Sequence, residues 1–209
     1  CGTHQVQLLL DAVSSFGAES IPFEHESLLA AAATANKCLH GLPGLAMVLC
    51  RRSALDQAIE PRNLCLNLQS WADHQARQST PFTPAVNGLL ALAQALKELD
   101  EQGGWKSRRM RYRTLASRVA DTCKKLGVTE WLPAQESSCV LRSYHLPAGM
   151  TYNQLHDGLK QQGFVIYAGQ GDLATRLFRI STMGEISDYD MARLEQALIL
   201  VIEGARNQK

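Results

Sequence analysis

Three residues with reactive or charged side chains stand in distinctive contexts along the sequence. Asp11 directly follows the apolar run Val6–Leu10. Lys37 stands just beyond a second apolar run, Leu28–Ala33, and Arg179 lies within the otherwise apolar stretch Phe178-Arg-Ile-Ser181. An acid or an amine at the end of an apolar strand is placed where α/β sheets bind their ligands. These three residues are therefore the first candidates for a functional site.

Together, these three residue types match what a pyridoxal cofactor and its substrate require. The cofactor needs a lysine amine for a Schiff base and an acid beside its pyridine nitrogen, so that the protonated ring accepts electrons. An amino-acid or keto-acid substrate also needs a planar cation for its anionic group, and arginine fits best. Taken singly, each residue is more often structural: an aspartate like Asp11 is more often a turn or cap residue, and a lysine like Lys37 a surface group. An arginine like Arg179 is more often a snorkelling side chain.

The elements that must position these residues change character along the chain. The first half has the apolar runs and turn signals of an α/β fold with a mostly parallel sheet, and its first strand is expected to be buried and parallel. The expected elements of this half are strands over 6–10, 28–33 and 45–50, a short helix capped by Ser53, a helix and exposed loop within 62–80, and a helix over 86–99.

The second half is predicted to be a smaller α+β domain. Its expected elements are helices over 105–126, 152–161 and 189–202, and strands over 138–145, 164–167 and 177–181. The pair Gly103-Gly104 interrupts the helical pattern between the halves. We therefore predict two domains, residues 1–104 and 105–209, with the boundary within Gly103–Trp105.

Composition narrows the classes of partner. Lys and Arg total 21 against 20 Asp and Glu, so the net charge of +1 gives no reason to expect a nucleic-acid or membrane partner. No apolar run approaches the roughly 18 residues of a membrane span. The six cysteines form no CxxC pair and show no metal-ligand spacing, so we expect no metal site and reduced thiols in a cytoplasmic protein.

Four other features receive structural interpretations. Gly169 and Gly171 are expected to form a tight turn rather than a phosphate-binding loop, because no helix start or lysine follows them. The basic cluster of residues 106–113 is expected to be a solvated helix face. Cys38 is interpreted as a small packed residue. His40 could serve as a base, but Lys37 already fills that role.

The motifs around Asp11 and Lys37 carry a family resemblance. Asp11-Ala-Val-Ser-Ser-Phe-Gly17, followed by Ala35-Asn-Lys-Cys-Leu-His-Gly-Leu-Pro-Gly44, resembles the class V aminotransferases of fold type I. The Ala-Asn-Lys-Cys and Gly-x-Pro-Gly pattern is most similar to the 2-aminoethylphosphonate–pyruvate aminotransferases, whereas alanine–glyoxylate and serine–pyruvate enzymes usually carry Ser-Gln-Lys. The resemblance continues through Phe82-Thr-Pro84, Gly163–Gly171 and Phe178–Gly184, and so covers essentially the whole chain.

The resemblance implies specific roles for matching residues. Lys37 would hold pyridoxal 5'-phosphate covalently and move the substrate proton, and Asp11 would pair with the pyridinium nitrogen. Val13 would pack on the ring, Asn36 and Thr83 would bind the phosphate, and Thr83 would reach the site of the other subunit of a homodimer. In the same way, Arg179 would bind the carboxylate of pyruvate or alanine.

The resemblance also implies a reaction and a missing part. The expected reaction converts 2-aminoethylphosphonate and pyruvate into phosphonoacetaldehyde and alanine. Two alternatives stay open: a class V aminotransferase that pairs alanine or serine with glyoxylate or pyruvate, and an inactive fragment that keeps the fold. The family carries a phosphate-binding loop and a ring-stacking aromatic residue upstream of the aspartate, and this chain begins at Cys1 without them. We therefore expect a fragment that is inactive alone.

Overall fold

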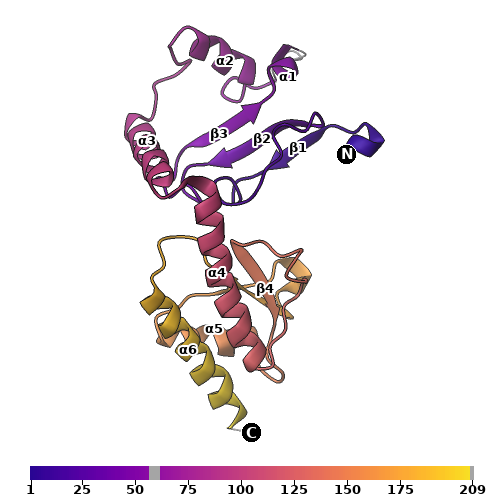
Figure 1. Cartoon of the computed structure of the whole chain (residues 1–209), viewed down its shortest axis with the longest axis vertical. Helices are drawn as coiled ribbons and strands as arrows, with labels where there is room; N and C mark the ends of the chain where they lie inside the picture. The colour runs from indigo at the N-terminus through magenta and orange to yellow at the C-terminus, as the bar shows by residue number, and fades with distance from the viewer. Residues whose placement is uncertain (57–61, 208–209) are drawn as a thin grey trace. The chain divides into compact units, whose positions relative to one another are not determined.

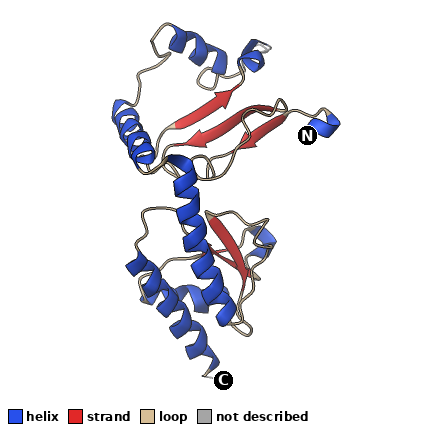
Figure 2. Cartoon of the chain, viewed as in Figure 1, coloured by secondary structure: helices blue, strands red, loops and turns tan. Residues whose placement is uncertain are grey.

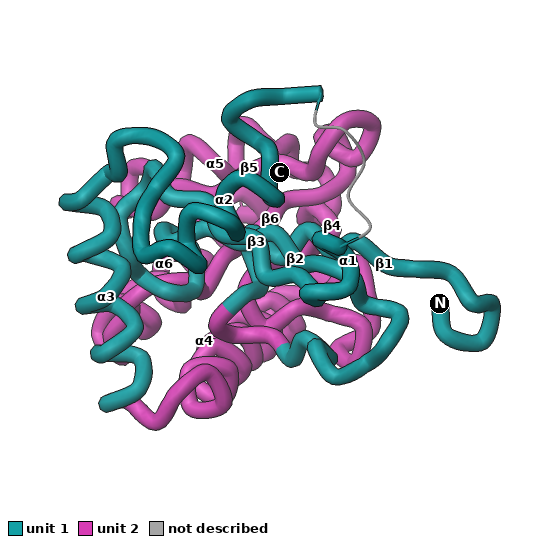
Figure 3. The backbone as a smooth tube through the Cα atoms, turned by 90° about the horizontal axis from the view of Figure 1, so that it is seen from above, with its two compact units in different colours: residues 1–16, 20–101 teal, residues 17–19, 102–209 magenta. Residues whose placement is uncertain are grey.

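A computed structural model describes residues 1–56 and 62–207 of the chain. These residues form two compact units, which are coloured separately in Figure 3. Unit 1 consists of Cys1–Phe16 and Ser20–Glu101, and unit 2 consists of Gly17–Glu19 and Gln102–Lys209. The chain therefore enters unit 2 twice, first for three residues between the first two apolar runs and then for its whole second half.

Unit 1 is built on a three-stranded sheet in the order β1-β2-β3 (Figure 1). The strands are β1 (Leu8–Asp11), β2 (Leu28–Thr34) and β3 (Ala46–Cys50). β1 is parallel to β2, whereas β3 is antiparallel to it. The alanine-rich sequence of β2 gives this central strand small side chains, and Ala31 and Ala33 are buried. The three strands lie where the apolar runs predict them.

The expectation that the first strand is buried is wrong for this unit. Leu9 is 74% exposed and Val6 is 53% exposed, although both belong to the apolar run that predicts a core strand. The physical reason is the position of β1 at the edge of the sheet, where it pairs with β2 on one side. An edge strand has a neighbour on only one flank, so apolar sequence alone does not bury it.

The described residues of unit 1 also form the helices α1 (Arg52–Asp56), α2 (Leu68–Ala76) and α3 (Val86–Glu101), with a short 3-10 turn at Gly2–His4. Asn67 caps α2 by accepting a hydrogen bond from the Ser70 backbone N–H at 3.1 Å. The loop between α2 and α3 contains Phe82, whose ring packs against Trp71 with 6.0 Å between centroids. α3 begins at Val86, as the sequence predicts, whereas α1 begins at Arg52 and so includes Ser53, the residue that the sequence predicts as its cap.

The described residues of unit 2 form helices and a second sheet, drawn in blue and red in Figure 2. Its helices are α4 (Gly104–Lys125), α5 (Tyr152–Gln161) and α6 (Asp188–Arg206). Its strands, β4 (Leu141–His145), β5 (Tyr167–Ala168) and β6 (Leu177–Ser181), form an antiparallel sheet in the order β4-β6-β5, and Gly171–Leu173 is a 3-10 turn. Tyr144 and Phe178 stack at 5.4 Å in a core that buries both.

Two helices of unit 2, α5 and α6, have strong local signals at their amino-terminal ends. Thr151 and Ser187 begin α5 and α6 with capping boxes, in which the side chain accepts from the backbone N–H three residues later and the side chain of that residue reaches back. Such caps satisfy backbone donors that a helix start otherwise leaves unpaired. These signals explain why the sequence predicts both helices well. No described helix has both the length and the apolar character needed to cross a membrane.

The basic cluster on α4 is only partly a solvated face. Arg108 is 5% exposed and donates to Gln102 Oε1 at 2.8 Å. Arg111 donates to Glu185 at 3.1 Å and to the backbone carbonyl of Ile186 at 2.6 Å. These guanidinium groups tie α4 to other segments of unit 2. The sequence interpretation is therefore wrong for Arg108, because packing buries its side chain, whereas Arg111 is exposed as expected while it forms these contacts.

Candidate active site

Asp11 and Lys37 follow the two parallel strands of unit 1. Asp11 is the last residue of β1 and pairs in register with Ala32 of β2. β2 ends at Thr34, and Lys37 comes three residues later. Neighbouring parallel strands run about 4.8 Å apart and end at the same edge of the sheet. The structure therefore places the acid and the amine after neighbouring strands at one sheet edge.

A local hydrogen bond orients the Asp11 carboxylate. Its Oδ1 accepts from the backbone N–H of Val13 at 3.0 Å, which forms a turn of the type that aspartate side chains favour. The backbone N–H of Ala12 donates to the carbonyl of Ala32 at 2.8 Å, so the strand pairing continues past Asp11. The Asp11 side chain is exposed and Val13 is half-buried. The acid is thus held by its own turn and remains accessible to a ligand.

A tight turn presents Lys37 after β2. The backbone N–H of His40 donates to the Lys37 carbonyl at 3.0 Å, and that of Gly41 donates to the Ala35 carbonyl at 2.8 Å. A Cβ at Gly41 would lie 3.0 Å from the Ala35 carbonyl oxygen, so this approach favours glycine. Lys37 itself is half-buried. The sequence after the lysine therefore closes a compact loop around it.

Cys38 links the loop after β1 to the loop after β2. Its side chain is fully buried, and Sγ donates to the carbonyl of Ser14 at 3.3 Å. Ser14 is three residues beyond Asp11, and Cys38 is adjacent to Lys37. The contact brings the two candidate loops together, and Cys38 has the environment of a small packed residue.

Asn36 and Thr83, the candidates for the cofactor phosphate, differ in their surroundings. Oδ1 of Asn36 lies 2.8 Å from Oγ1 of Thr34, so Asn36 is held beside Lys37 at the end of β2. Thr83 is exposed in the loop before α3, where the Thr80 hydroxyl donates to the Phe82 carbonyl at 2.8 Å. Asp11, Val13, Asn36 and Lys37 thus gather at one sheet edge, and Thr83 lies in a separate loop of the same unit.

Arg179 belongs to unit 2 and lines a cavity of about 360 Å³ there. Its Nε donates to the Ala168 carbonyl at 2.7 Å, which anchors the guanidinium to the β5 side of β6. Across residues 1–56 and 62–207, no carboxylate forms an ion pair with Arg179. The cavity is also lined by Tyr167, Ser181 and Glu185. An arginine anchored through Nε keeps its Nη donors for a planar anion.

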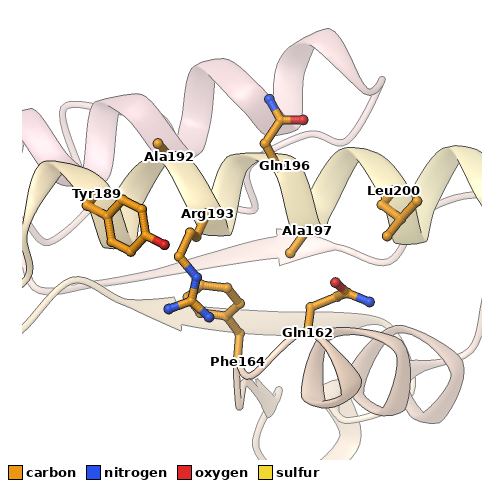
Figure 4. A pocket seen from close by; sticks show the side chains of 8 residues that line it. All are labelled: Gln162, Phe164, Tyr189, Ala192, Arg193, Gln196, Ala197 and Leu200. Carbon is orange, nitrogen blue, oxygen red and sulfur yellow. The ribbon is translucent and has the colours of Figure 1, made fainter.

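A second, more open groove lies beside the amino-terminal half of α6 (Figure 4). Arg193 projects from α6, and its guanidinium lies 5.3 Å from the Phe164 ring and 5.8 Å from the Tyr189 ring. Gln162 and Gln196 flank the groove. None of the residues that the sequence predicts for the site lines this groove, although Phe164 and Arg193 line both the groove and the cavity that contains Arg179.

The turn between β5 and β6 has the structural role that sequence predicts. A Cβ at Gly169 would lie 2.5 Å from the Leu173 carbonyl oxygen, which is closer than side-chain atoms normally approach. The 3-10 turn begins directly afterwards, at Gly171. This turn packs against its own backbone and carries Ala168, the acceptor of the Arg179 hydrogen bond.

Glu19 is a half-buried carboxylate that the sequence analysis does not single out. Its Oε1 accepts from the Ser138 hydroxyl at 2.9 Å and from the Cys139 backbone N–H at 2.8 Å. Burial by itself raises the pKa of this carboxyl, but these hydrogen bonds and the charge of Arg109 outweigh burial and hold the pKa below its ordinary value. The sequence hints at this role of Glu19 only by placing an acid in the short segment after Phe16-Gly17.

In the part of the chain that the structure describes, no group of three or more His, Cys, Asp or Glu side chains is arranged to hold a metal ion. The acid and amine at the edge of the unit 1 sheet are instead the donor set that suits an organic cofactor with a carbonyl group and a basic ring nitrogen.

Comparison with known proteins places this site in a family context. No protein-family model matches the chain. The chain is 38% identical over 196 residues to the 2-aminoethylphosphonate–pyruvate transaminase of Syntrophobacter fumaroxidans, which covers 90% of this chain and 52% of that protein. The enzyme of the same name from Aeromonas hydrophila is 35% identical over 192 residues, covering 90% and 50%. The chain thus spans about half the length of these curated relatives.

Solved structures show the same fold. The chain matches a subgroup IV aspartate aminotransferase from Thermus thermophilus with a TM-score of 0.84 and 26% identity, covering 95% of this chain and 56% of that one. It matches an alanine–glyoxylate aminotransferase from Nostoc sp. with a TM-score of 0.83 and 19% identity, covering 94% and 54%. For the pyridoxamine–pyruvate aminotransferase of Mesorhizobium loti, the TM-score is 0.77 and the identity 26%, covering 99% and 54%.

Sequence and fold agree in these comparisons. The chain has the fold of the fold type I pyridoxal-phosphate aminotransferases and is homologous, over 90% of its length, to the 2-aminoethylphosphonate–pyruvate transaminases.

Proposed function

We propose that the protein containing this chain is a pyridoxal-phosphate-dependent aminotransferase that transfers the amino group of 2-aminoethylphosphonate to pyruvate, giving phosphonoacetaldehyde and alanine. The observation that supports the chemistry best is the placement of Asp11 and Lys37 after neighbouring parallel strands, with their loops joined through Cys38 and Ser14. The curated relatives with this name support the choice of substrates. Because the chain spans about half of those relatives, the proposal concerns the full-length protein.

The residues at the sheet edge fit the cofactor chemically. Lys37 would hold pyridoxal phosphate covalently through Nζ, Asp11 would accept a hydrogen bond from the protonated pyridine nitrogen, and Val13 would contact the ring. The Val13 N–H already holds one oxygen of Asp11, so the carboxylate keeps one orientation. When bound, the cofactor supplies an electron sink for the bond that breaks at the carbon bearing the amino group.

Lys37 would also serve as the proton carrier. Its Nζ would take the proton from the carbon that bears the amino group of the donor, and would return a proton to Cα of pyruvate in the second half-reaction. An amine does this best when its pKa is near the working pH and when it is held close to both carbons. The closed turn from Ala35 to Gly41 restricts where Lys37 can reach.

Arg179 would orient pyruvate through its carboxylate. Nε is already occupied by the Ala168 carbonyl, which leaves the Nη edge to form the paired hydrogen bonds that a carboxylate accepts. We extend this role to the phosphonate of the other substrate, because both anions present oxygens to the same donors. Asn36 and Thr83 would bind the cofactor phosphate, with Thr83 supplied by the second subunit of a homodimer in the cytoplasm.

The second candidate pairs alanine or serine with glyoxylate or pyruvate. The alanine–glyoxylate and pyridoxamine–pyruvate enzymes among the structural matches favour it at the level of fold and keto acid. The Asn36-Lys37-Cys38 sequence favours the phosphonate donor, because the alanine and serine enzymes usually have Ser-Gln-Lys at this point. A chain that keeps the fold without catalysis is the third possibility.

Two measurements on the full-length protein test these candidates. We expect a visible absorbance band that borohydride abolishes, and its absence would leave the non-catalytic alternative. We then expect 2-aminoethylphosphonate to be the best donor to pyruvate in a screen that includes alanine and serine. A preference for alanine or serine with glyoxylate would replace the proposed substrate but keep the reaction class.

A further inference from the structure

The segment Gly17–Glu19 belongs to unit 2, although the residues on both sides of it belong to unit 1. Ala18 within it is fully buried, and the Cys139 thiol faces the Ala18 carbonyl at 3.9 Å. Glu19 is eight residues beyond Asp11 along the chain. The segment that leaves the candidate cofactor acid is therefore anchored in unit 2 by a short insertion.

The Glu19 carboxylate makes further polar contacts between the segment Gly17–Glu19 and the rest of unit 2. Oε1 accepts from the Ser138 hydroxyl and from the Cys139 backbone N–H, at 2.9 and 2.8 Å. Oε2 lies 3.4 Å from Nη2 of Arg109 on α4, and the side chain of Glu19 is 22% exposed. A carboxylate that accepts two hydrogen bonds and faces one cation holds its neighbours more firmly than a solvated glutamate can.

The residues that Glu19 holds continue directly to the strand of Arg179. The carbonyl of Cys139 accepts from the Thr182 hydroxyl at 3.1 Å, and the carbonyl of Val140 accepts from the Thr182 backbone N–H at 3.0 Å. Thr182, which is 3% exposed, follows the last residue of β6. In the β4–β6 pairing that begins here, Ser143 is the register partner of Arg179.

We propose that Glu19 is a positioning residue for Arg179. By fixing Ser138 and Cys139, its carboxylate sets where β4 begins against the end of β6, and so sets the place of the Arg179 guanidinium. The inference rests on the proposed role of Arg179 in binding the keto-acid carboxylate. It adds that this role depends on a side chain from the same loop that carries Asp11.

The geometry links Glu19 to the placement of Arg179 in particular, and not only to the stability of unit 2. Arg179 is anchored on its other side by the Ala168 carbonyl at 2.7 Å, so a shift of β4 against β6 would change one anchor and leave the other. A guanidinium that must meet a carboxylate edge-on tolerates little displacement, and a shift of about 1 Å can cost about 10²-fold in rate. Removal of Glu19 should therefore affect the binding of pyruvate and not only the amount of folded protein.

The experiment compares Glu19→Ala and Glu19→Gln with the wild type in the full-length protein. Gln keeps an oxygen for the Ser138 and Cys139 donors but loses the charge that faces Arg109. Glu26→Ala is the matched control, because Glu26 is an exposed acid in the same connection between β1 and β2. The first readout is KM for pyruvate, which does not depend on the concentration of active enzyme.

The second readout is hydrogen exchange of backbone amides in β4 and β6, which requires no activity. We expect KM for pyruvate to rise about tenfold or more in Glu19→Ala and less in Glu19→Gln. We also expect the Glu19 variants to increase the rate of amide exchange over the wild type at residues 138–143 and 177–182 more than in α6. Exchange in Glu26→Ala should match the wild type.

Two outcomes overturn the inference. One is an unchanged KM for pyruvate in both Glu19 variants of an active enzyme. The other is β4–β6 exchange in the Glu19 variants that matches the wild type or rises uniformly through unit 2. If the wild type fails to transaminate pyruvate, the proposed function is wrong, and hydrogen exchange still decides whether Glu19 positions β6.

Discussion

Cys38 Sγ donates a hydrogen bond to the backbone carbonyl of Ser14 at 3.3 Å. One partner is adjacent to Lys37, and the other is three residues past Asp11. A buried contact between the two loops limits how far the acid and the amine can move apart, because a thiol this well packed cannot shift without opening a cavity. This pair is the strongest structural reason to treat Asp11 and Lys37 as parts of one site.

Lys37→Ala should remove the covalent link to the cofactor in the full-length protein. We expect the borohydride-sensitive absorbance band to disappear and transamination to fall by about 10²–10⁴-fold or more, since the proton carrier is lost as well. Lys97→Ala is the control, because Lys97 is an exposed lysine in an i,i+4 ion pair with Glu101 on α3. Persistence of the band in Lys37→Ala would assign the link to another lysine.

Asp11→Asn should leave the cofactor bound but slow its chemistry. The amide oxygen can still accept from the Val13 N–H, so the turn is kept, but a neutral group cannot hold a proton on the pyridine nitrogen. We expect both half-reactions to slow by about 10²-fold or more in stopped-flow absorbance. Asp56→Asn, at an exposed position in α1, should react like the wild type. Wild-type rates in Asp11→Asn would mean that another acid pairs with the ring.

Mixing two variants tests whether Thr83 serves the site of a second subunit. If it does, a heterodimer of Lys37→Ala and Thr83→Ala chains has both defects at one site and an intact second site. We expect activity to recover, after the two proteins are unfolded and refolded together, to about one quarter of the wild-type value, from the random statistics of pairing. No recovery from two variants that are each inactive would place Thr83 in the site of its own chain.

Gly169→Ala and Gly204→Ala should have opposite effects on stability. At Gly169 the new Cβ would meet the Leu173 carbonyl at 2.5 Å, whereas at Gly204 in α6 it would meet nothing within 4 Å. We expect Gly169→Ala to lower the free energy of unfolding by about 1–3 kcal/mol through overpacking. We expect Gly204→Ala to raise it by up to about 1 kcal/mol, because alanine favours the helix. Urea denaturation measures both free energies of unfolding. Equal effects of the two substitutions would contradict the close approach of Gly169 to the Leu173 carbonyl.

Protonation of the Glu19 carboxylate in acid should make unit 2 less stable. Its pKa is lowered in the folded protein, because hydrogen bonds from Cys139 and Ser138 and the charge of Arg109 outweigh the effect of burial. A lowered pKa contributes stability that is fully present above the ordinary glutamate pKa of about 4.3. That contribution is lost as pH falls through the lower folded pKa.

Urea titrations at several pH values below about 5 should therefore show a smaller acid loss of stability in Glu19→Gln than in the wild type. At neutral pH the variant should be the less stable protein. An identical pH dependence in the two proteins would mean that Glu19 does not titrate differently on folding.

Much of this fold follows from local sequence. The apolar runs at residues 28–33 and 177–181 predict the central strand of each sheet, and the structure has β2 and β6 there. Thr151 and Ser187 mark helix starts because their side chains bond within three residues. Asp11 and Lys37 could be singled out because residue type and position after a strand are also local properties.

The structure alone decided which residues have partners far away in the chain. The apolar sequence at Val6 and Leu9 cannot show that β1 is an edge strand, since burial depends on what lies beside it. The charge pattern of α4 cannot show that Arg108 is buried or that Arg109 faces Glu19, ninety positions earlier. Each partner comes from a different part of the chain, and the local periodicity of the sequence cannot predict such contacts. The sequence by itself therefore determined the elements and the candidate chemistry, and tertiary packing determined that Cys38 meets Ser14 and that Glu19 is held by Ser138 and Cys139.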